Sequence, residues 1–383
     1  MTARERLLTA LDHREPDRVP LDLGSTHVTG ISAIAYTNLR SHLGLPDEEP
    51  LIVDDVQQIA LPGDDVMARF GVDIRGLFPI TSNNITVPLV DSTDAWEYRD
   101  EWGLVHHKPK EDGLYFSLVK SPIDAMATTV EAIAAHPWPV AADPARIQGL
   151  RRQAQAYRAQ GYPVVLKGFC AGLCEVACRI RGMENFLCDL MVEEAVTAAL
   201  LDKILQLKLE FWHMALGELG DLVDVVLEAD DYGTQESQLV PPERFRSIFK
   251  PRLAELFAAI KRDAPHAKLL MHSCGSVRDI IPDFIQIGVD VLNPVHVTAS
   301  GMEPAGLKRD FGDALCFWGG GVDTQGVLPT GTPRQVRDDV RRNVQALAEG
   351  GGYVYNTVHN IQADVPPENI VAMYEALAEA GRY

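Results

Sequence analysis

The sequence has few of the features that mark membrane, secreted or disulfide-bonded proteins. Its longest strictly apolar runs, such as residues 269–271, are far shorter than the roughly 20 residues that a transmembrane helix needs. The N-terminal segment carries Arg4, Glu5 and Arg6 and lacks the apolar core of a secretory signal. Six cysteines in 383 residues are too few for a disulfide scaffold. We therefore expect a cytoplasmic protein with no membrane partner.

Clusters of basic residues are also scarce. Lys and Arg number 35 against 54 Asp and Glu, which gives a formal net charge of −19. The Arg-bearing stretch 334–342 interleaves Asp338 and Asp339, a pattern typical of a solvated helix face. A nucleic-acid-binding protein would instead carry a basic stripe that neutralises phosphates. We expect no nucleic-acid partner.

What the chain does contain is a repeated alternation of strand and helix patterns. Amphipathic runs such as 192–217 and 336–349 follow short apolar, β-branched stretches, as expected of a parallel sheet with outer helices. An N-terminal helix is predicted over residues 3–12. Eight candidate strands in one chain predict an α/β fold of the (β/α)8 TIM-barrel type. They are residues 19–24, 72–78, 164–169, 223–230, 268–272, 289–293, 315–318 and 353–358.

The chain shows no internal repeat and no low-complexity linker, so we predict a single TIM-barrel domain over residues 1–383. The second and third candidate strands are too far apart for an ordinary barrel connection. Between them, residues 85–90, 96–108 and 114–119 have short-strand patterns separated by turn residues. We predict a β-rich insertion at about 79–162 that lies over the barrel mouth.

Polar residues gather where the predicted strands end, and the C-terminal ends of barrel strands carry the chemistry of this fold. The clearest pattern is His272-Ser273-Cys274, because residues two apart on a strand point to the same face. Imidazole nitrogen and thiolate sulfur are zinc ligands, and a catalytic zinc keeps three protein ligands and one open position. His359, at the end of the eighth strand, is the candidate third ligand. The alternative is a packed cysteine beside a hydrogen-bonded histidine.

Asp230 and Asp231 follow the fourth strand and are the candidate catalytic carboxylates. They could equally form a solvated acidic pair or a helix N-cap. The other five cysteines are expected to be core residues, three of them (Cys170, Cys174 and Cys178) on one helical stripe. Further polar residues at strand ends are candidates for substrate binding: His27, Tyr232, Gln235, His296, Asp323, Asn360 and Gln362.

Taken together, several motifs resemble the uroporphyrinogen decarboxylase superfamily, specifically its methyltransferase-like branch. The resemblance covers most of the chain and implies a TIM barrel, in agreement with the strand count. Its motifs are Arg4-Glu5-Arg6 to Arg18-Val19-Pro20, Asp100-Glu101-Trp102-Gly103, Asp230-Asp231-Tyr232-Gly233-Thr234-Gln235, His272-Ser273-Cys274-Gly275, Gly320-Gly321-Val322-Asp323-Thr324-Gln325, and His359-Asn360-Ile361-Gln362 followed by Pro366-Pro367-Glu368-Asn369.

The two branches of this superfamily differ in chemistry. The porphyrinogen decarboxylases use no metal and grip an octa-carboxylate substrate with an Arg-rich segment after the first strand, where residues 24–29 of this chain contain no arginine. Porphyrinogen decarboxylation is therefore not expected. The methyltransferase-like branch holds zinc with a His-x-Cys motif and a later cysteine, and moves a methyl group between a thiol and a corrinoid protein. His272 and Cys274 match that motif.

The chain departs from the branch at the third ligand, where the later cysteine aligns with His359. An imidazole in place of a thiolate leaves the zinc more positive, which also suits a zinc that polarises an ether or amine so that a partner's cobalt can remove its methyl group. No Asp-x-His-x-x-Gly cobalamin motif occurs in the chain, so cobalamin would arrive only on a corrinoid carrier protein. The resemblance thus implies a zinc-dependent methyltransferase of one-carbon metabolism, acting on a small-molecule methyl donor or acceptor. A metal-dependent lyase or hydrolase on the same barrel, or a non-catalytic small-molecule binding protein, remains an alternative.

Overall fold

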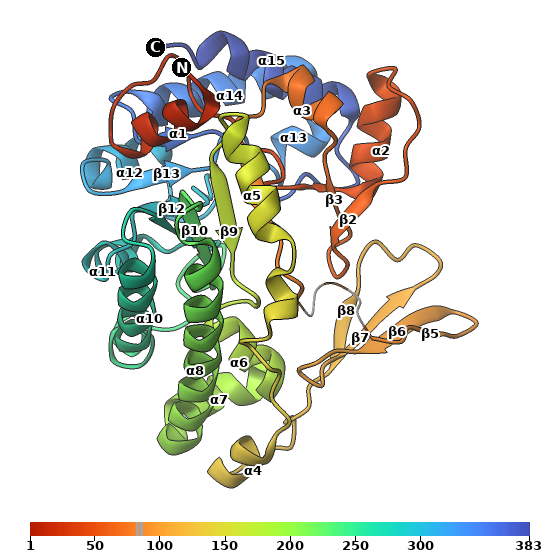
Figure 1. Cartoon of the computed structure of the whole chain (residues 1–383), viewed down its shortest axis with the longest axis vertical. Coiled ribbons are helices and arrows are strands. Elements are labelled where there is room, and N and C mark those ends of the chain that lie inside the picture. Colours follow the sequence, from red (N-terminus) through yellow and green to blue (C-terminus); the bar gives the residue numbers. More distant parts are fainter. Residues whose placement is uncertain (82–83, 85–86) are drawn as a thin grey trace.

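The computed structural model describes residues 1–81, 84 and 87–383. Its central feature is a curved parallel sheet of seven strands in the order β14-β13-β12-β11-β10-β9-β4, of which β9, β10, β12 and β13 are labelled in Figure 1. The strands are β4 (Arg75–Leu77), β9 (Val164–Lys167), β10 (Val225–Ala229), β11 (Lys268–His272), β12 (Val291–Asn293), β13 (Cys316–Trp318) and β14 (Tyr353–Val354). Seven of the eight predicted strands are therefore present at the predicted places.

The first predicted strand, residues 19–24, is reduced to a single parallel bridge between Leu21 and Tyr355. Tyr355 N donates to Pro20 O at 2.8 Å, and Asp73 N donates to Leu21 O at 2.9 Å. The segment thus contacts both the β14 side of the sheet and the residues that precede β4. Pro20 has no N–H to donate, which explains why no longer ladder forms.

Alternation along the strands divides their side chains between two cores. Leu227, Leu270 and Val291 belong to an inner cluster, together with Leu7 and Leu11 of helix α1 (Ala3–Leu11). Their sequence neighbours on the strands pack outward against the helices. α1 therefore covers the interior at the ends where the strands begin, and it confirms the predicted N-terminal helix.

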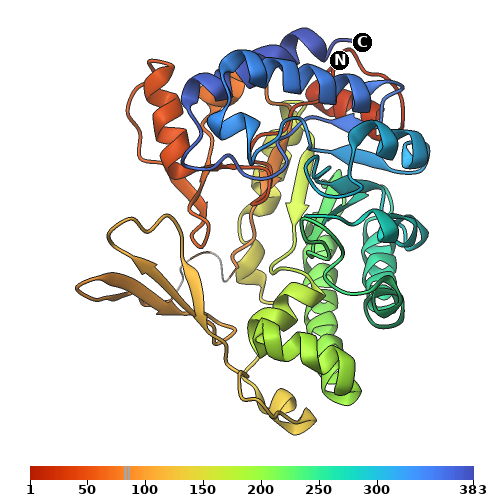
Figure 2. The ribbon, with the colours of Figure 1, turned by 180° about the vertical axis from the view of Figure 1, so that it is seen from behind.

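The helices that follow the strands form the outer layer, seen from both sides in Figures 1 and 2. The helix pairs α8 with α10 and α14 with α15 pack side by side. The helices are α2 (Ala33–His42), α3 (Asp64–Phe70), α5 (Leu150–Ala159), α6 (Leu173–Arg181), α7 (Met183–Val192), α8 (Glu194–Leu219), α9 (Pro242–Arg244), α10 (Lys250–Asp263), α11 (Ile281–Gln286), α12 (Pro304–Phe311), α13 (Val327–Thr330), α14 (Pro333–Ala348) and α15 (Pro367–Ala380), with short η1 (Pro144–Ile147), η2 (Phe245–Phe249) and η3 (Arg278–Ile280). In the part of the chain that the structure describes, no helix combines the length and apolarity needed to cross a membrane.

The long connection between β4 and β9 contains an antiparallel sheet, β5 (Val90–Asp91), β6 (Ala95–Arg99), β7 (Val105–Pro109) and β8 (Ser117–Lys120), and helix α4 (Val130–Ala135). This sheet projects to one side of the molecule in Figures 1 and 2. The predicted strand 85–90 begins in residues outside the described part, and its described portion contributes only Val90. The predicted strand 96–108 is two strands, because Asp100 caps the turn between them by accepting from Trp102 N and Leu104 N at 2.9 Å.

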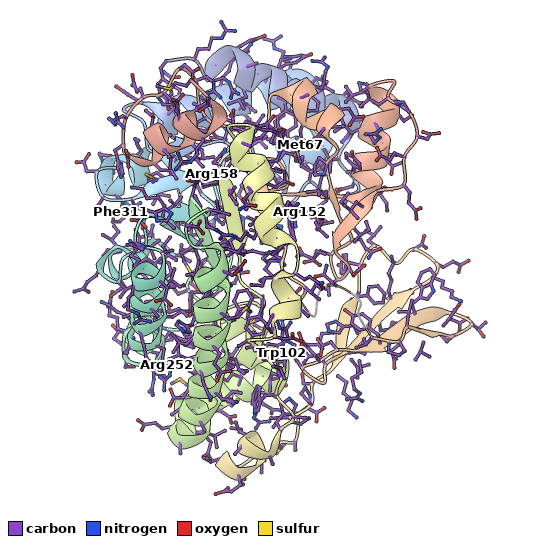
Figure 3. All side chains as sticks on the ribbon, viewed as in Figure 1. Met67, Trp102, Arg152, Arg158, Arg252 and Phe311 are labelled. Atoms are coloured by element: carbon purple, nitrogen blue, oxygen red, sulfur yellow. The ribbon has the colours of Figure 1, made fainter. Side chains whose placement is uncertain are left out.

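Two contacts tie this connection to the parallel sheet. The Trp102 ring stacks on Phe169, which follows β9, with ring centroids 5.8 Å apart. Helix α5 packs against β4 and β9, and the Nη1 of its Arg158, which is labelled in Figure 3, donates to Asp224 Oδ1 at 3.0 Å. α5 therefore forms part of the helix layer although it lies within residues 79–162. The single-domain organisation of residues 1–383 stays a prediction. A third, small sheet joins β1 (Ile31–Ser32), β3 (Ile59–Leu61) and β2 (Leu51–Asp54).

Candidate metal centre and its cavity

The structure brings together the three residues predicted as metal ligands. His272 is the last residue of β11, and it points to the interior because Leu270, two residues earlier, does so. Cys274 follows on the same face. His359 lies in the loop after β14, where Thr357 Oγ1 donates to the His359 carbonyl and holds the loop in place.

The geometry of these side chains suits a zinc ion. One potential ligand atom from each of the three residues lies within 4.8 Å of the other two. Zinc ligands at 2.0–2.3 Å in a tetrahedron lie roughly 3.3–3.8 Å from one another. Cys274 Sγ and His272 Nε2, 3.5 Å apart, already have that separation. The residues present therefore fit the metal, and a shift of about 1 Å would bring every pair into this range.

A hydrogen bond fixes the orientation of the His272 ring. Its Nδ1 lies 2.5 Å from Asn293 Oδ1, and Asn293 Nδ2 donates to Trp318 O at 2.8 Å. Because the amide nitrogen of Asn293 is used in that second bond, its oxygen accepts from Nδ1–H. The lone pair of His272 is then on Nε2, directed toward Cys274, which is how a histidine ligand is normally prepared for a metal.

Burial sets the protonation of the cluster before any metal binds. It lowers the pKa of His359 to about 4 and also lowers the pKa of His272, so both rings are neutral at pH 7. Burial raises the pKa of the Cys274 thiol well above its usual value. The metal-free cluster is thus two neutral imidazoles and a thiol, and a metal would have to displace the thiol proton.

Asp231 is the candidate carboxylate that reaches this cluster. Its Oδ1 accepts from Cys274 N at 2.8 Å and lies 3.7 Å from His272 Nε2. The strand pattern explains its direction, since Leu227 of β10 points inward and residue 231 has the same parity. Asp231 therefore both positions Cys274 and places a carboxylate beside the candidate metal.

Asp230 and Tyr232 have the opposite parity and point away from the cavity. The Asp230 carboxylate accepts from Cys174 N and Glu175 N, each at 2.9 Å, in the first turn of α6. Tyr232 OH donates to the same carboxylate at 2.5 Å, and its ring packs in the core against Phe245, 4.9 Å between centroids. Burial is the main influence on Asp230 and raises its pKa to about 7. The helix-cap interpretation describes Asp230, and its contacts support no direct role for either residue in substrate binding.

Of the remaining predicted substrate residues, one lines the cavity and the others hold the loops around it through hydrogen bonds. His27 lines the cavity. Asn360 Nδ2 donates to His27 O at 2.8 Å, while its Oδ1 accepts from Gly30 N at 2.7 Å, so Asn360 shapes the His27 loop. His296 Nδ1 accepts from Gly275 N at 3.0 Å and supports the turn after Cys274.

Three others are not among the residues that line this cavity. Gln235 Nε2 donates to Thr298 O at 2.8 Å. Asp323 accepts from Gln325 N and Gly326 N at the start of α13. Gln362 Nε2 donates to Asn360 O at 3.1 Å. These contacts stabilise the loops at the strand ends.

The cavity beside the cluster has a volume of about 220 Å³ and is lined by His272, His359, Asp231 and His27. Lys167, Glu175 and Arg179 also line it, and the sequence analysis missed all three. Lys167 could have been found, because it lies within the predicted strand 164–169 and shares the parity of the inward-facing Val165. Glu175 and Arg179 are four residues apart on α6, and in sequence such an acid–base pair looks like any salt bridge on the surface of a helix.

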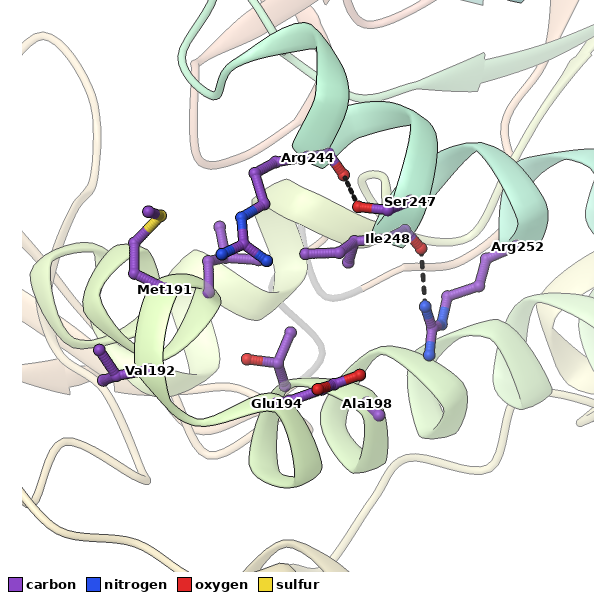
Figure 4. A pocket seen from close by; sticks show the side chains of 10 residues that line it. Met191, Val192, Glu194, Ala198, Arg244, Ser247, Ile248 and Arg252 are labelled. Atoms are coloured by element: carbon purple, nitrogen blue, oxygen red, sulfur yellow. Dashed lines mark hydrogen bonds between the residues drawn. The ribbon is translucent and has the colours of Figure 1, made fainter.

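Two other features lie outside this site. The expectation that all remaining cysteines are core residues is wrong for Cys188, which is exposed, and too strong for Cys170 and Cys178, which are half-buried. A pocket of about 350 Å³ between α7, α8 and the segment around Arg244 and Arg252 contains none of the predicted site residues (Figure 4).

Comparisons with known proteins agree with this architecture. A methyltransferase from Methanosarcina mazei superposes with a TM-score of 0.60 over 99% of both chains, at 18% sequence identity. That likeness establishes a shared fold. The uroporphyrinogen decarboxylase of Serratia proteamaculans is 33% identical over 94 residues, a match that spans 23% of this chain and 27% of the relative. The family model described as Uroporphyrinogen decarboxylase (URO-D) matches residues 119–380. This chain belongs to the uroporphyrinogen decarboxylase family.

Proposed function

We propose that the protein is a zinc-dependent methyltransferase that moves a methyl group between a small substrate or thiol and a corrinoid carrier protein. The observation that carries the proposal is the convergence of one thiol and two neutral imidazoles beside a cavity at the ends of the parallel strands. The methyltransferase fold of the M. mazei protein supports it.

In this proposal His272, Cys274 and His359 hold the zinc. The bound zinc would act as a Lewis acid on the heteroatom that gains or loses the methyl group. Asn293 keeps the His272 ring oriented through its Nδ1, and the Asp231 carboxylate holds Cys274 N while facing the cavity. Asp231 is also placed to accept a proton from a substrate thiol or amine at the same wall.

The size of the cavity supports a reaction in which this protein binds the small substrate and a separate carrier protein holds the corrinoid. About 220 Å³ lies below the roughly 300–1,000 Å³ of pockets that hold drug-sized ligands, so only a small molecule fits. A corrinoid is much larger than such a ligand and would have to approach from outside on its own carrier. The same argument disfavours an octa-carboxylate porphyrinogen as the substrate.

The proposal also includes the finer architecture. We infer that the Leu21 bridge completes an eight-stranded barrel and that the β5–β8 sheet, anchored through Trp102, lies over its mouth and contributes to substrate exclusion from water. We place the reaction in the cytoplasm, where a thiolate ligand would remain reduced.

The test is a reconstituted methyl-transfer assay. The zinc-loaded protein is mixed with a reduced corrinoid carrier and candidate methyl ethers, methylamines or thiols, and the cobalamin spectrum is followed. We expect spectral turnover that requires both carrier and zinc and that is lost in His272→Ala but retained in His213→Ala, whose exposed ring lies on α8 outside the site. Full activity on a small substrate with corrinoid excluded would contradict the proposal.

One observation favours a second candidate. Asp231 lies 3.7 Å from His272 Nε2 and lines the cavity, which is the arrangement of a general base beside a Lewis-acidic metal. A metal-dependent lyase or hydrolase is therefore the alternative, and it predicts corrinoid-independent turnover that Asp231→Asn abolishes. Tight binding of a small molecule without turnover would instead indicate a non-catalytic binding protein.

A further inference from the structure

Lys167 is a buried cation that has no counter-ion in contact among the described residues, although its Nζ lies 6.0 Å from the centroid of the Phe78 ring. Lys167 is the last residue of β9 and is 2% exposed. Its ammonium group makes no hydrogen bond or ion pair with the described residues. The other buried lysine and arginine side chains of residues 1–81, 84 and 87–383 all have such partners. Lys208 Nζ, for example, lies 2.8 Å from Glu228 Oε2, and Arg181 Nε donates to Asp189 Oδ2 at 2.7 Å.

An ammonium group that leaves water without an ion-pair partner is costly, so an anionic occupant of the cavity that supplied the missing charge would be bound favourably. Burial lowers the pKa of Lys167, as expected for a cation that is poorly compensated. Its place on the cavity lining means that an occupant of the cavity could pair with it.

Two further donors face the same cavity from other elements. Arg179 of α6 donates one Nη2 bond to Glu175 Oε1 at 2.7 Å, which leaves its other N–H groups available. His27 Nδ1 is buried and has no hydrogen-bond partner in the part of the chain that the structure describes. Burial lowers the pKa of His27 well below its usual value, and the positive charges of Lys167 and Arg179, which line the same cavity, lower it further.

The carboxylates nearby limit the charge that the occupant can carry. Glu175 and Asp231 line the cavity, and burial lowers the pKa of Lys167 although the negative charge of Asp54 acts to raise it. Glu175 pairs with Arg179 and Asp231 accepts from Cys274 N, so Lys167 is the cation left for an occupant to neutralise with one negative charge. A second negative charge, as on phosphate, would face the carboxylates of Glu175 and Asp231 without a further cation to balance it. A single carboxylate is the group that fits this balance.

We propose that the substrate is a small carboxylic acid whose carboxylate is bound by Lys167 and Arg179, while its methyl-bearing end reaches the His272-Cys274-His359 cluster. The position given to the methyl-bearing end rests on the proposed function, but the preference of the cavity for a carboxylate requires neither zinc nor catalysis. The two ideas can therefore fail separately.

The test is calorimetric titration of the whole protein, as purified and again after chelation of metal. The ligands are methoxyacetate, the neutral methoxyacetamide, 2-methoxyethylammonium and inorganic phosphate. Because a charge-assisted bond is worth more than a neutral one, we expect methoxyacetate to bind roughly tenfold or more tightly than its amide in both preparations. Lys167→Met should lose this preference. Lys268→Met, at the opposite end of the strands and paired with Asp12, should keep it.

Thermal denaturation of Lys167→Met separates a ligand-binding role from a structural one. Removal of an uncompensated buried charge should leave the melting temperature unchanged or raised, so lost selectivity in a stable variant supports the proposal. Equal or tighter binding of the amide, the ammonium compound or phosphate would overturn it. Persistence of the carboxylate preference in Lys167→Met, or no methoxyacetate binding across the full titration, would overturn it as well.

Discussion

Zinc binding is the property on which the candidate site can be tested most directly. We expect the protein to bind about one zinc ion per chain through His272, Cys274 and His359, since these are the ligand atoms that converge within 4.8 Å. His272→Ala and Cys274→Ala each remove one of the two atoms already at zinc-like separation, 3.5 Å apart, and should lose most zinc. His359→Ala should bind zinc more weakly than the wild type.

The expected stabilisation can be calculated. Zinc at 100 times its dissociation constant should stabilise the folded protein by about 2.7 kcal/mol. An unfolding entropy of about 2.1 cal/mol/K per residue gives about 0.8 kcal/mol/K for 383 residues, so zinc should raise the melting temperature by about 3 °C. The three ligand variants should show little or none of this increase.

Elemental analysis and thermal denaturation with and without added zinc provide the assay. Cys188→Ser and His213→Ala are matched controls, because both residues are exposed on helices outside the cluster. Both controls should retain the zinc content and the thermal shift of the wild type. If His272→Ala and Cys274→Ala retain them as well, the ligand assignment is wrong.

Three further predictions concern protons and charge at buried sites. Zinc binding at pH 7 should release about one proton, because the Cys274 thiol, with its raised pKa, must lose its proton, whereas His359, with a pKa of about 4, is already neutral. Calorimetry in buffers of different ionisation enthalpy measures the number of protons released. Release of two or more protons would contradict this prediction. His359→Cys should still bind zinc, but the second thiolate makes the zinc centre neutral. A neutral zinc should acidify its bound ligand less, so the acidic limb of the pH–rate profile should move to higher pH. An unmoved profile would place His359 outside the zinc shell. Lys208→Met should lower the free energy of unfolding by about 3–5 kcal/mol, because the buried Glu228 carboxylate would lose its ion-pair partner at 2.8 Å. Urea denaturation measures this change, and a loss below about 1 kcal/mol would refute the reasoning.

The sequence determined the features that depend on local pattern. Seven of the eight predicted strands are where the β-branched runs lie, because such runs fit a buried parallel sheet in any tertiary context. The His272-Ser273-Cys274 motif placed two potential ligands on one face by the alternation of a strand alone. The antiparallel strands between residues 90 and 120 also followed from short alternating runs and turn residues.

Only the tertiary structure decided which neighbours face the cavity. Asp230 and Asp231 are equivalent in sequence, and the register of β10 sends one toward α6 and the other toward the candidate metal ligands. A shift of one residue would exchange them, and no local pattern fixes that choice. Likewise, Lys167 and Arg179 come from a strand and a helix whose packing brings two cations to one small volume, a coincidence in space that residue spacing along the chain does not contain.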